Sequence, residues 1–128
     1  MIKMRINYVG NYETEIENTN IKTDRKGEIM SPSDMMALSV AACGMTVLSL
    51  KAEKEKIAFE NSYAEVSKET DIKEKFMLTS LTIEYHLSKK YTGKEREMLE
   101  NSVYNRCVVG RSIKDEVKKN YVFIYDLD

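Results

Sequence analysis

The chain has 128 residues, of which 42% are hydrophobic and 32% are charged, a composition typical of folded globular proteins and not of disordered ones. Lysine and arginine total 20 against 21 acidic residues, so the formal charge is −1, whereas nucleic-acid-binding proteins usually carry a basic excess. We therefore expect a single domain, residues 1–128, that does not bind nucleic acids.

The start of the chain lacks the apolar segment and small-residue cleavage site of a signal peptide. The longest uncharged run, residues 35–50, is shorter than the ~20 residues that a membrane span needs. We expect a cytoplasmic protein with no membrane contact, in a reducing compartment where structural disulfides do not persist. Cys43 and Cys107 are then either inert buried thiols or reactive ones.

The first part of the chain predicts short β-strands. Apolar and polar residues alternate from Ile2 to Tyr8, as in a strand with one buried face. Gly10-Asn11 is a turn signal, so residues 12–16 are expected to return as the second strand of a hairpin. A third short strand is expected at residues 20–23, before a polar loop at residues 24–30 that contains Gly27.

A long helix is predicted to begin after Ser31, which can cap it. Pro32 takes the first helical position, and Asp34 lies three residues after the cap. The helix is then apolar on every side as far as Leu50, so it must be enclosed on all sides. Because so short a chain can hardly surround such a helix, we infer that a second subunit covers part of it. Beyond Leu50 the sequence KAEKEK is polar, and the helix is expected to leave the core there.

Two long strands are predicted next, at residues 58–68 and 76–87, joined by a charged turn into an antiparallel hairpin. Thr92 and Glu95 then form the capping box of another helix. Met98, Leu99, Ser102 and Val103 share one face of this helix.

The end of the chain predicts a break, a short helix and a strand. The sequence Cys107-Val108-Val109-Gly110 interrupts the preceding helix. Ile113 and Val117 are four residues apart, which suggests a short final helix. Residues 121–127 are β-branched and aromatic and predict a closing strand. The order of elements describes an α+β domain.

Several kinds of site are not predicted. The glycines are scattered and form no phosphate-binding loop, and the two cysteines are too far apart for a Cys-x-x-Cys motif. The single histidine, His86, is expected on the solvent face of a strand, as an exposed residue and not as a zinc ligand or catalytic base. We therefore predict no metal and no cofactor.

The surroundings of the two cysteines permit thiol chemistry. Small residues precede and follow Cys43, so another backbone or a small molecule can approach it. Cys107 lies where a helix stops, between Arg106 and Arg111, and a nearby cation lowers the pKa of a thiol.

Two segments resemble the OsmC/Ohr superfamily, which contains osmotically inducible and organic hydroperoxide resistance proteins. The segment SPSDMMALSVAACGMTVLSLKAEKEKI resembles the first signature, in which Ser-Pro opens a long central helix that carries a cysteine after small residues. The segment NSVYNRCVVGRSI resembles the second signature, usually Cys-Pro-Val followed by a short helix. The spacing of the two signatures also matches, and the resemblance extends from about Tyr8 to Tyr125.

This resemblance implies an intertwined α+β homodimer, with antiparallel sheets around a long buried central helix and active sites near the subunit interface. It implies that Cys43 is the peroxidatic cysteine, whose thiolate attacks a peroxide and becomes a sulfenic acid. Cys107 would be the resolving cysteine, which forms a disulfide with Cys43. A thiol or dithiol reductant would then restore both thiols. The apolar setting favours organic hydroperoxides as substrates.

Three positions depart from the hydroperoxide resistance branch and place the chain nearer the OsmC-like branch. Ser33 stands where that branch has a glutamate. Asp34 is no substitute, because it lies nine residues before Cys43 and therefore on the opposite side of the helix. Residues 10–12 contain no arginine, although that branch uses one in its first hairpin to ionise the thiol. Val108 replaces the proline after the second cysteine. The cation that activates the thiol could be Arg25, Arg106 or Arg111.

Three functions remain open from the sequence. The first is a cysteine-based thiol peroxidase, an oxidoreductase acting on organic hydroperoxides. The second is a dimeric binding or redox-sensing protein that holds a small apolar ligand at the subunit interface. The third is a scaffold with inert cysteines. The reactivity of Cys43 as a thiolate discriminates between them.

Overall fold

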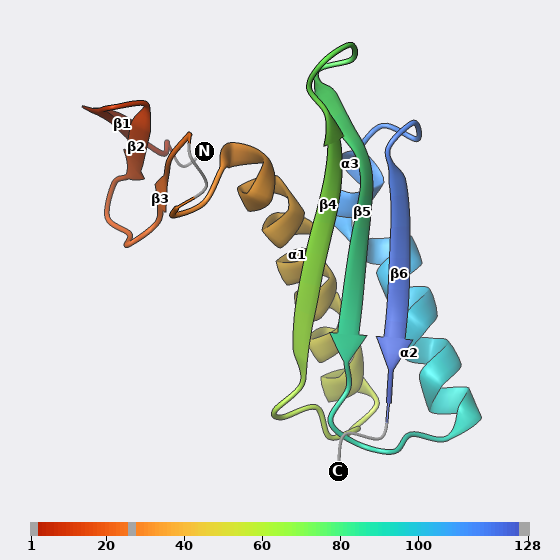
Figure 1. Cartoon of the computed structure of the whole chain (residues 1–128). Helices are drawn as coiled ribbons and strands as arrows, with labels where there is room; N and C mark the ends of the chain where they lie inside the picture. The colour runs from red at the N-terminus through yellow and green to blue at the C-terminus, as the bar shows by residue number, and fades with distance from the viewer. Residues whose placement is uncertain (1–2, 26–27, 126–128) are drawn as a thin grey trace. The chain divides into compact units, whose positions relative to one another are not determined.

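The computed structural model describes residues 3–25 and 28–125 of the chain. These residues form two compact units, one ending at Met36 and the other beginning at Ala37, and each unit is described by itself. The first unit contains β1 (Ile6–Gly10), β2 (Glu13–Ile16), β3 (Lys22–Thr23) and the start of α1 (Pro32–Lys54). The second unit contains the rest of α1 and all later elements (Figure 1).

The first unit is a three-stranded antiparallel sheet in the order β1-β2-β3, as the sequence predicts. Asn11 and Tyr12 form the turn between β1 and β2 with φ angles of 52° and 63°. Positive φ at both turn positions gives the backbone twist that suits a tight hairpin. Ile2, where the first strand was predicted to begin, and Gly27 of the predicted loop lie outside the described residues.

The predicted cap of α1 is confirmed by reciprocal hydrogen bonds. The Asp34 N–H donates to Ser31 Oγ at 3.1 Å, and the Ser31 N–H donates to Asp34 Oδ2 at 3.0 Å. Two of the N–H groups that the helix leaves without backbone partners are thereby satisfied, so Asp34 serves as a cap.

The second unit is built on a three-stranded sheet in the order β4-β5-β6, with the helices on one face (Figure 1). Its strands are β4 (Tyr63–Asp71), β5 (Met77–His86) and β6 (Lys118–Ile124). β4 and β5 are antiparallel, but β5 and β6 are parallel, so the prediction of purely antiparallel sheets is wrong for this sheet. The chain between β5 and β6 contains α2 (Gly93–Arg106) and α3 (Val108–Ser112), and a helical crossover of this length is what parallel strands require.

The core of this unit joins β5 to one stripe of α1. Leu81, Ile83 and Tyr85 lie on one face of β5 and are completely buried, as is Leu87 directly after the strand. The residues of α1 buried in the structure are Ala37, Val40, Ala41, Gly44, Leu48 and Ala52. Since Ala52 is only 1% exposed, the prediction that the helix leaves the core beyond Leu50 is wrong by about one turn.

Other apolar side chains of α1 are exposed in the protomer. Leu38 is 48% exposed and Leu50 is 62% exposed. Within the described residues, α1 is the single helix long and apolar enough to span a membrane, judged by length and composition alone. About a third of its apolar window is buried inside the protein.

The end of the chain differs in part from its prediction. The capping box of Thr92 and Glu95 is confirmed at the start of α2. The final helix is α3, and the prediction that Ile113 and Val117 share a helix is wrong, because Ile113 is extended and ends α3. β6 begins at Lys118, three residues before the predicted strand, and residues 126–128 lie outside the described part.

Candidate functional site

His86 is not the exposed strand residue that the sequence predicts. It is half-buried, and its ring stacks on the Tyr63 ring with centroids 4.5 Å apart. Its Nε2 is buried and has no hydrogen-bond partner among the described residues. Within residues 3–25 and 28–125, no three metal-ligating side chains lie close enough together to hold a metal ion.

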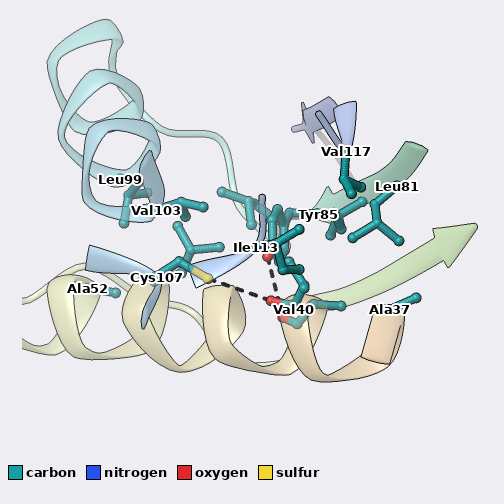
Figure 2. Packing of buried hydrophobic residues seen from close by; sticks show 14 of the residues in the cluster. Ala37, Val40, Ala52, Leu81, Tyr85, Leu99, Val103, Cys107, Ile113 and Val117 are labelled. Carbon is teal, nitrogen blue, oxygen red and sulfur yellow. Dashed lines mark hydrogen bonds between the residues drawn. The ribbon is translucent and has the colours of Figure 1, made fainter. Parts of the chain in front are cut away.

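Cys107 lies at the junction of α2 and α3 and is completely buried. Its extended backbone ends α2, and its side chain caps α3 by accepting a hydrogen bond from the Gly110 N–H, with N and Sγ 3.4 Å apart. Its Sγ also lies 3.8 Å from the carbonyl oxygen of Val40 on α1, to which it donates (Figure 2). Cys107 is therefore held against α1 at Val40, which lies less than one helical turn before Cys43.

Cys43 lies in the middle of α1 as a free, half-buried thiol, and Cys107 is also free. The two thiols are close enough that Cys43 raises the pKa of Cys107. The structure thus brings together the two cysteines that the sequence singled out, although 64 positions separate them along the chain.

Burial raises the pKa of the Cys107 thiol above its ordinary value. The Gly110 N–H, the next largest influence, lowers this pKa, and the Tyr121 hydroxyl also lowers it. No cation is among the principal causes. The expectation that Arg106 and Arg111 favour the thiolate is therefore not met at Cys107.

The three candidate arginines differ in their surroundings. Arg106 and Arg111 are exposed, and Arg111 donates to the carbonyl oxygen of Asn105 at 3.3 Å. Arg25, in the first unit, lies over the Tyr12 ring, 4.9 Å from its centroid. The guanidinium groups of Arg111 and Arg25 thus each contact a partner that is not a cysteine.

Two tyrosines that the sequence analysis did not single out line the site. Tyr85 of β5 donates from its hydroxyl to the carbonyl oxygen of Ala41 at 3.4 Å, and it occupies the space that a side chain on Gly44 would fill. Tyr121 of β6 likewise occupies the space that a side chain on Gly110 would fill. The signal in the sequence was the glycine close after each cysteine, since a missing Cβ allows a close approach.

Burial raises the pKa of both tyrosines, and the charge of the Cys107 thiolate adds to the effect. Tyr121 reaches a pKa of about 12, and Tyr85 lies further above its ordinary value. Both side chains are therefore neutral hydroxyl groups at physiological pH, able to donate a hydrogen bond.

A cavity of about 510 Å³ lies between the second half of α1 and α2. Its wall begins at Val47, one helical turn after Cys43. The lining combines apolar side chains with amides and cations: Val47, Leu50, Lys51, Lys54, Met98, Asn101, Ser102, Asn105 and Arg106. A ligand with both an apolar part and an anionic or polar part suits such a wall.

The fold is shared by solved structures over nearly the whole chain. A Psychrobacter arcticus protein named for osmotic stress induction and a detoxification response is 24% identical, with 96% of each chain covered and a TM-score of 0.86. The organic hydroperoxide resistance protein OsmC of Legionella pneumophila is 16% identical, with 97% of this chain and 98% of that chain covered and a TM-score of 0.76. OhrB of Bacillus subtilis, an organic hydroperoxide resistance protein, is 15% identical, with 95% and 98% covered and a TM-score of 0.71.

Sequence comparison supports the same relationship. No curated protein sequence matches the chain significantly. The family model described as "OsmC-like protein" matches residues 25–121, which include both cysteines and most of the second unit. On this match, and on a fold that agrees with it, the chain belongs to the OsmC-like protein family.

Proposed function

We propose that this protein is a cysteine-based thiol peroxidase that reduces organic hydroperoxides in the cytoplasm. Cys43 is the peroxidatic cysteine and Cys107 the resolving cysteine. The observation that carries the proposal is the placement of a half-buried thiol beside a completely buried one. A peroxide can reach the first sulfur, while the second is held nearby and protected from direct oxidation.

In the oxidative step, the Cys43 thiolate attacks one oxygen of the hydroperoxide. An S–O bond forms, the O–O bond breaks, and the alkoxide leaves with a proton as an alcohol. Cys107 then attacks the Cys43 sulfenic acid, so that an S–S bond forms and water leaves. Two thiol groups of an external reductant return both cysteines to thiols and become a disulfide themselves.

Organic hydroperoxides are favoured over hydrogen peroxide for two reasons. Two of the solved structures with this fold are named as organic hydroperoxide resistance proteins. In this chain, the cavity that begins one turn after Cys43 contains Val47, Leu50 and Met98, which can contact an alkyl chain.

A hydroperoxide titration tests the proposal. Adding cumene hydroperoxide to the reduced protein is expected to consume both thiols with one equivalent of peroxide and to leave an internal disulfide. In a Cys107→Ser variant, resolution is blocked and a sulfenic acid is expected to accumulate on Cys43. Free thiols are counted with a chromogenic disulfide, and a dimedone adduct on Cys43 is located by mass spectrometry.

Thiols that stay reduced with excess hydroperoxide would overturn the peroxidase and favour a second function. In that case the protein is a dimeric binding or redox-sensing protein, for which the cavity of about 510 Å³ provides space for a small ligand.

The matched control for the dimedone experiment is the Cys43→Ser variant, which is expected to give no dimedone adduct at position 43.

The proposed functional form is a homodimer in which α1 is covered by a second copy. Leu38 and Leu50 of α1 are exposed in the protomer, although this helix is the most apolar segment of the chain. Replacing Leu38, which does not line the cavity, by Glu is expected to weaken the dimer about tenfold, because a charge would have to enter an apolar interface. Light scattering after gel filtration measures the mass.

The matched control for the dimer is Ile72→Glu. Ile72 is 70% exposed and lies in the turn after β4, not on α1, so this variant is expected to stay dimeric. A wild-type protein that is monomeric at micromolar concentration would contradict the proposal. That residues 1–128 fold as a single domain is also still a prediction.

A further inference from the structure

Among the described residues, the principal influences on the pKa of Cys107 include two hydrogen-bond donors and no cation. One donor is the Gly110 N–H, 3.4 Å from Sγ. The other is the Tyr121 hydroxyl. The point where a Cβ on Gly110 would lie is 3.2 Å from Cys107 Sγ and closer still to Tyr121 Oη, so the missing side chain opens a common space for the hydroxyl and the sulfur.

Tyr121 is held in this position by its neighbours. Its ring packs edge-on against Tyr104 with centroids 5.2 Å apart, and it stacks on Tyr85 with centroids 6.4 Å apart. The Tyr85 hydroxyl is committed to the carbonyl oxygen of Ala41. The Tyr121 hydroxyl has no such backbone partner in the described part of the chain, so it remains available to the sulfur.

We propose that the Tyr121 hydroxyl and the Gly110 N–H together bind the Cys107 thiolate when it leaves the disulfide. This inference rests on the proposed function, since it assigns a role in the reductive half of that cycle. A reductant thiolate attacks the more exposed sulfur, Cys43, and forms a mixed disulfide there. The S–S bond to Cys107 breaks and Cys107 takes the electron pair as a thiolate. A second reductant thiol then releases Cys43.

The need for these donors follows from burial. A thiolate formed in an apolar interior without hydrogen bonds is strongly destabilised, which slows any step in which it is the leaving group. The side chains around it, Cys43 on α1, Tyr85 on β5 and Tyr121 on β6, carry no positive charge, so donated hydrogen bonds replace a cation as the source of stabilisation.

The test measures how fast dithiothreitol reduces the internal disulfide, which is first formed with diamide so that no peroxidase activity is required. Tyr121→Phe is expected to slow this reduction about tenfold, the effect of losing one hydrogen bond to a charged acceptor. Tyr125→Phe is the matched control. Tyr125 lies directly after β6, on the same face as Tyr121. Its hydroxyl donates to Glu100 Oε2 at 2.6 Å, so removing this hydroxyl is expected to leave the rate of disulfide reduction unchanged.

A second measurement separates this role from general damage to the fold. Urea unfolding of the reduced Tyr121→Phe protein is expected to follow that of the wild type, because Cys107 is then a neutral thiol that needs no donated hydrogen bond. Equal reduction rates for Tyr121→Phe and Tyr125→Phe would overturn the inference, as would failure of diamide to link the two cysteines. A peroxidase that fails while the diamide experiment succeeds would overturn only the proposed function.

Discussion

Replacing Cys43 by serine is expected to lower the rate of organic hydroperoxide reduction at least about 1,000-fold, because a serine hydroxyl is far less nucleophilic than a thiolate at neutral pH. The rate is the consumption of cumene hydroperoxide in the presence of excess dithiothreitol. Cys107→Ser is expected to differ in kind: its first turnover proceeds at the wild-type rate, and only resolution is lost.

The control for this loss is Ser49→Ala, a change on the same helix. The Ser49 hydroxyl donates to the carbonyl oxygen of Thr46, so its removal changes α1 locally without removing a thiol. This variant is expected to keep the wild-type rate. A Cys43→Ser protein that also keeps that rate would show that the nucleophile lies elsewhere.

Replacing Gly44 by alanine is expected to destabilise the fold by about 2 kcal/mol, typical of overpacking in a core. The new Cβ would collide with the hydroxyl group of Tyr85, which is completely buried and has no room to move away. The sign of this effect is informative, since alanine normally stabilises a helix interior by about 1 kcal/mol over glycine. Urea unfolding at fixed protein concentration measures the change.

Two variants make this prediction specific to the contact with Tyr85. Gly93 has nothing within 4 Å of its Cβ position, so Gly93→Ala is expected to be neutral or slightly stabilising. Tyr85→Phe removes the hydroxyl but keeps Cζ, 2.6 Å from the Cβ position, so Gly44→Ala is expected to cost less in that background while still destabilising the fold. An equal cost in both backgrounds would mean that the destabilisation has another source.

Local signals in the sequence were reliable where the structure depends on neighbouring residues. Ser31 and Asp34 satisfy each other's N–H groups within one turn, and the same is true of Thr92 and Glu95. Such caps depend only on residues close in the chain, so the starts of α1 and α2 were predictable. The antiparallel pairing of β1 with β2 followed from its turn residues in the same way.

Two of the predictions that proved wrong concern contacts between distant segments. The partner of β6 is β5, and their parallel orientation follows from the crossover through α2 and α3. His86 looked like an outward strand residue, but Tyr63 from the neighbouring strand covers its ring. Alternation along one strand says which side chains share a face, and not what covers that face.

By itself, the sequence determined the α+β class, the capped apolar helix that carries Cys43 and the family to which the chain belongs. Those properties depend on local periodicity and on motifs that can be read along the chain. Only the tertiary structure decided that Cys107 is buried against α1 and that Tyr85 and Tyr121 fill the spaces beside Gly44 and Gly110. The pKa of a thiol depends on the groups that surround it in space, and here those groups include Cys43 on α1 and Tyr121 on β6 as well as the nearby Gly110.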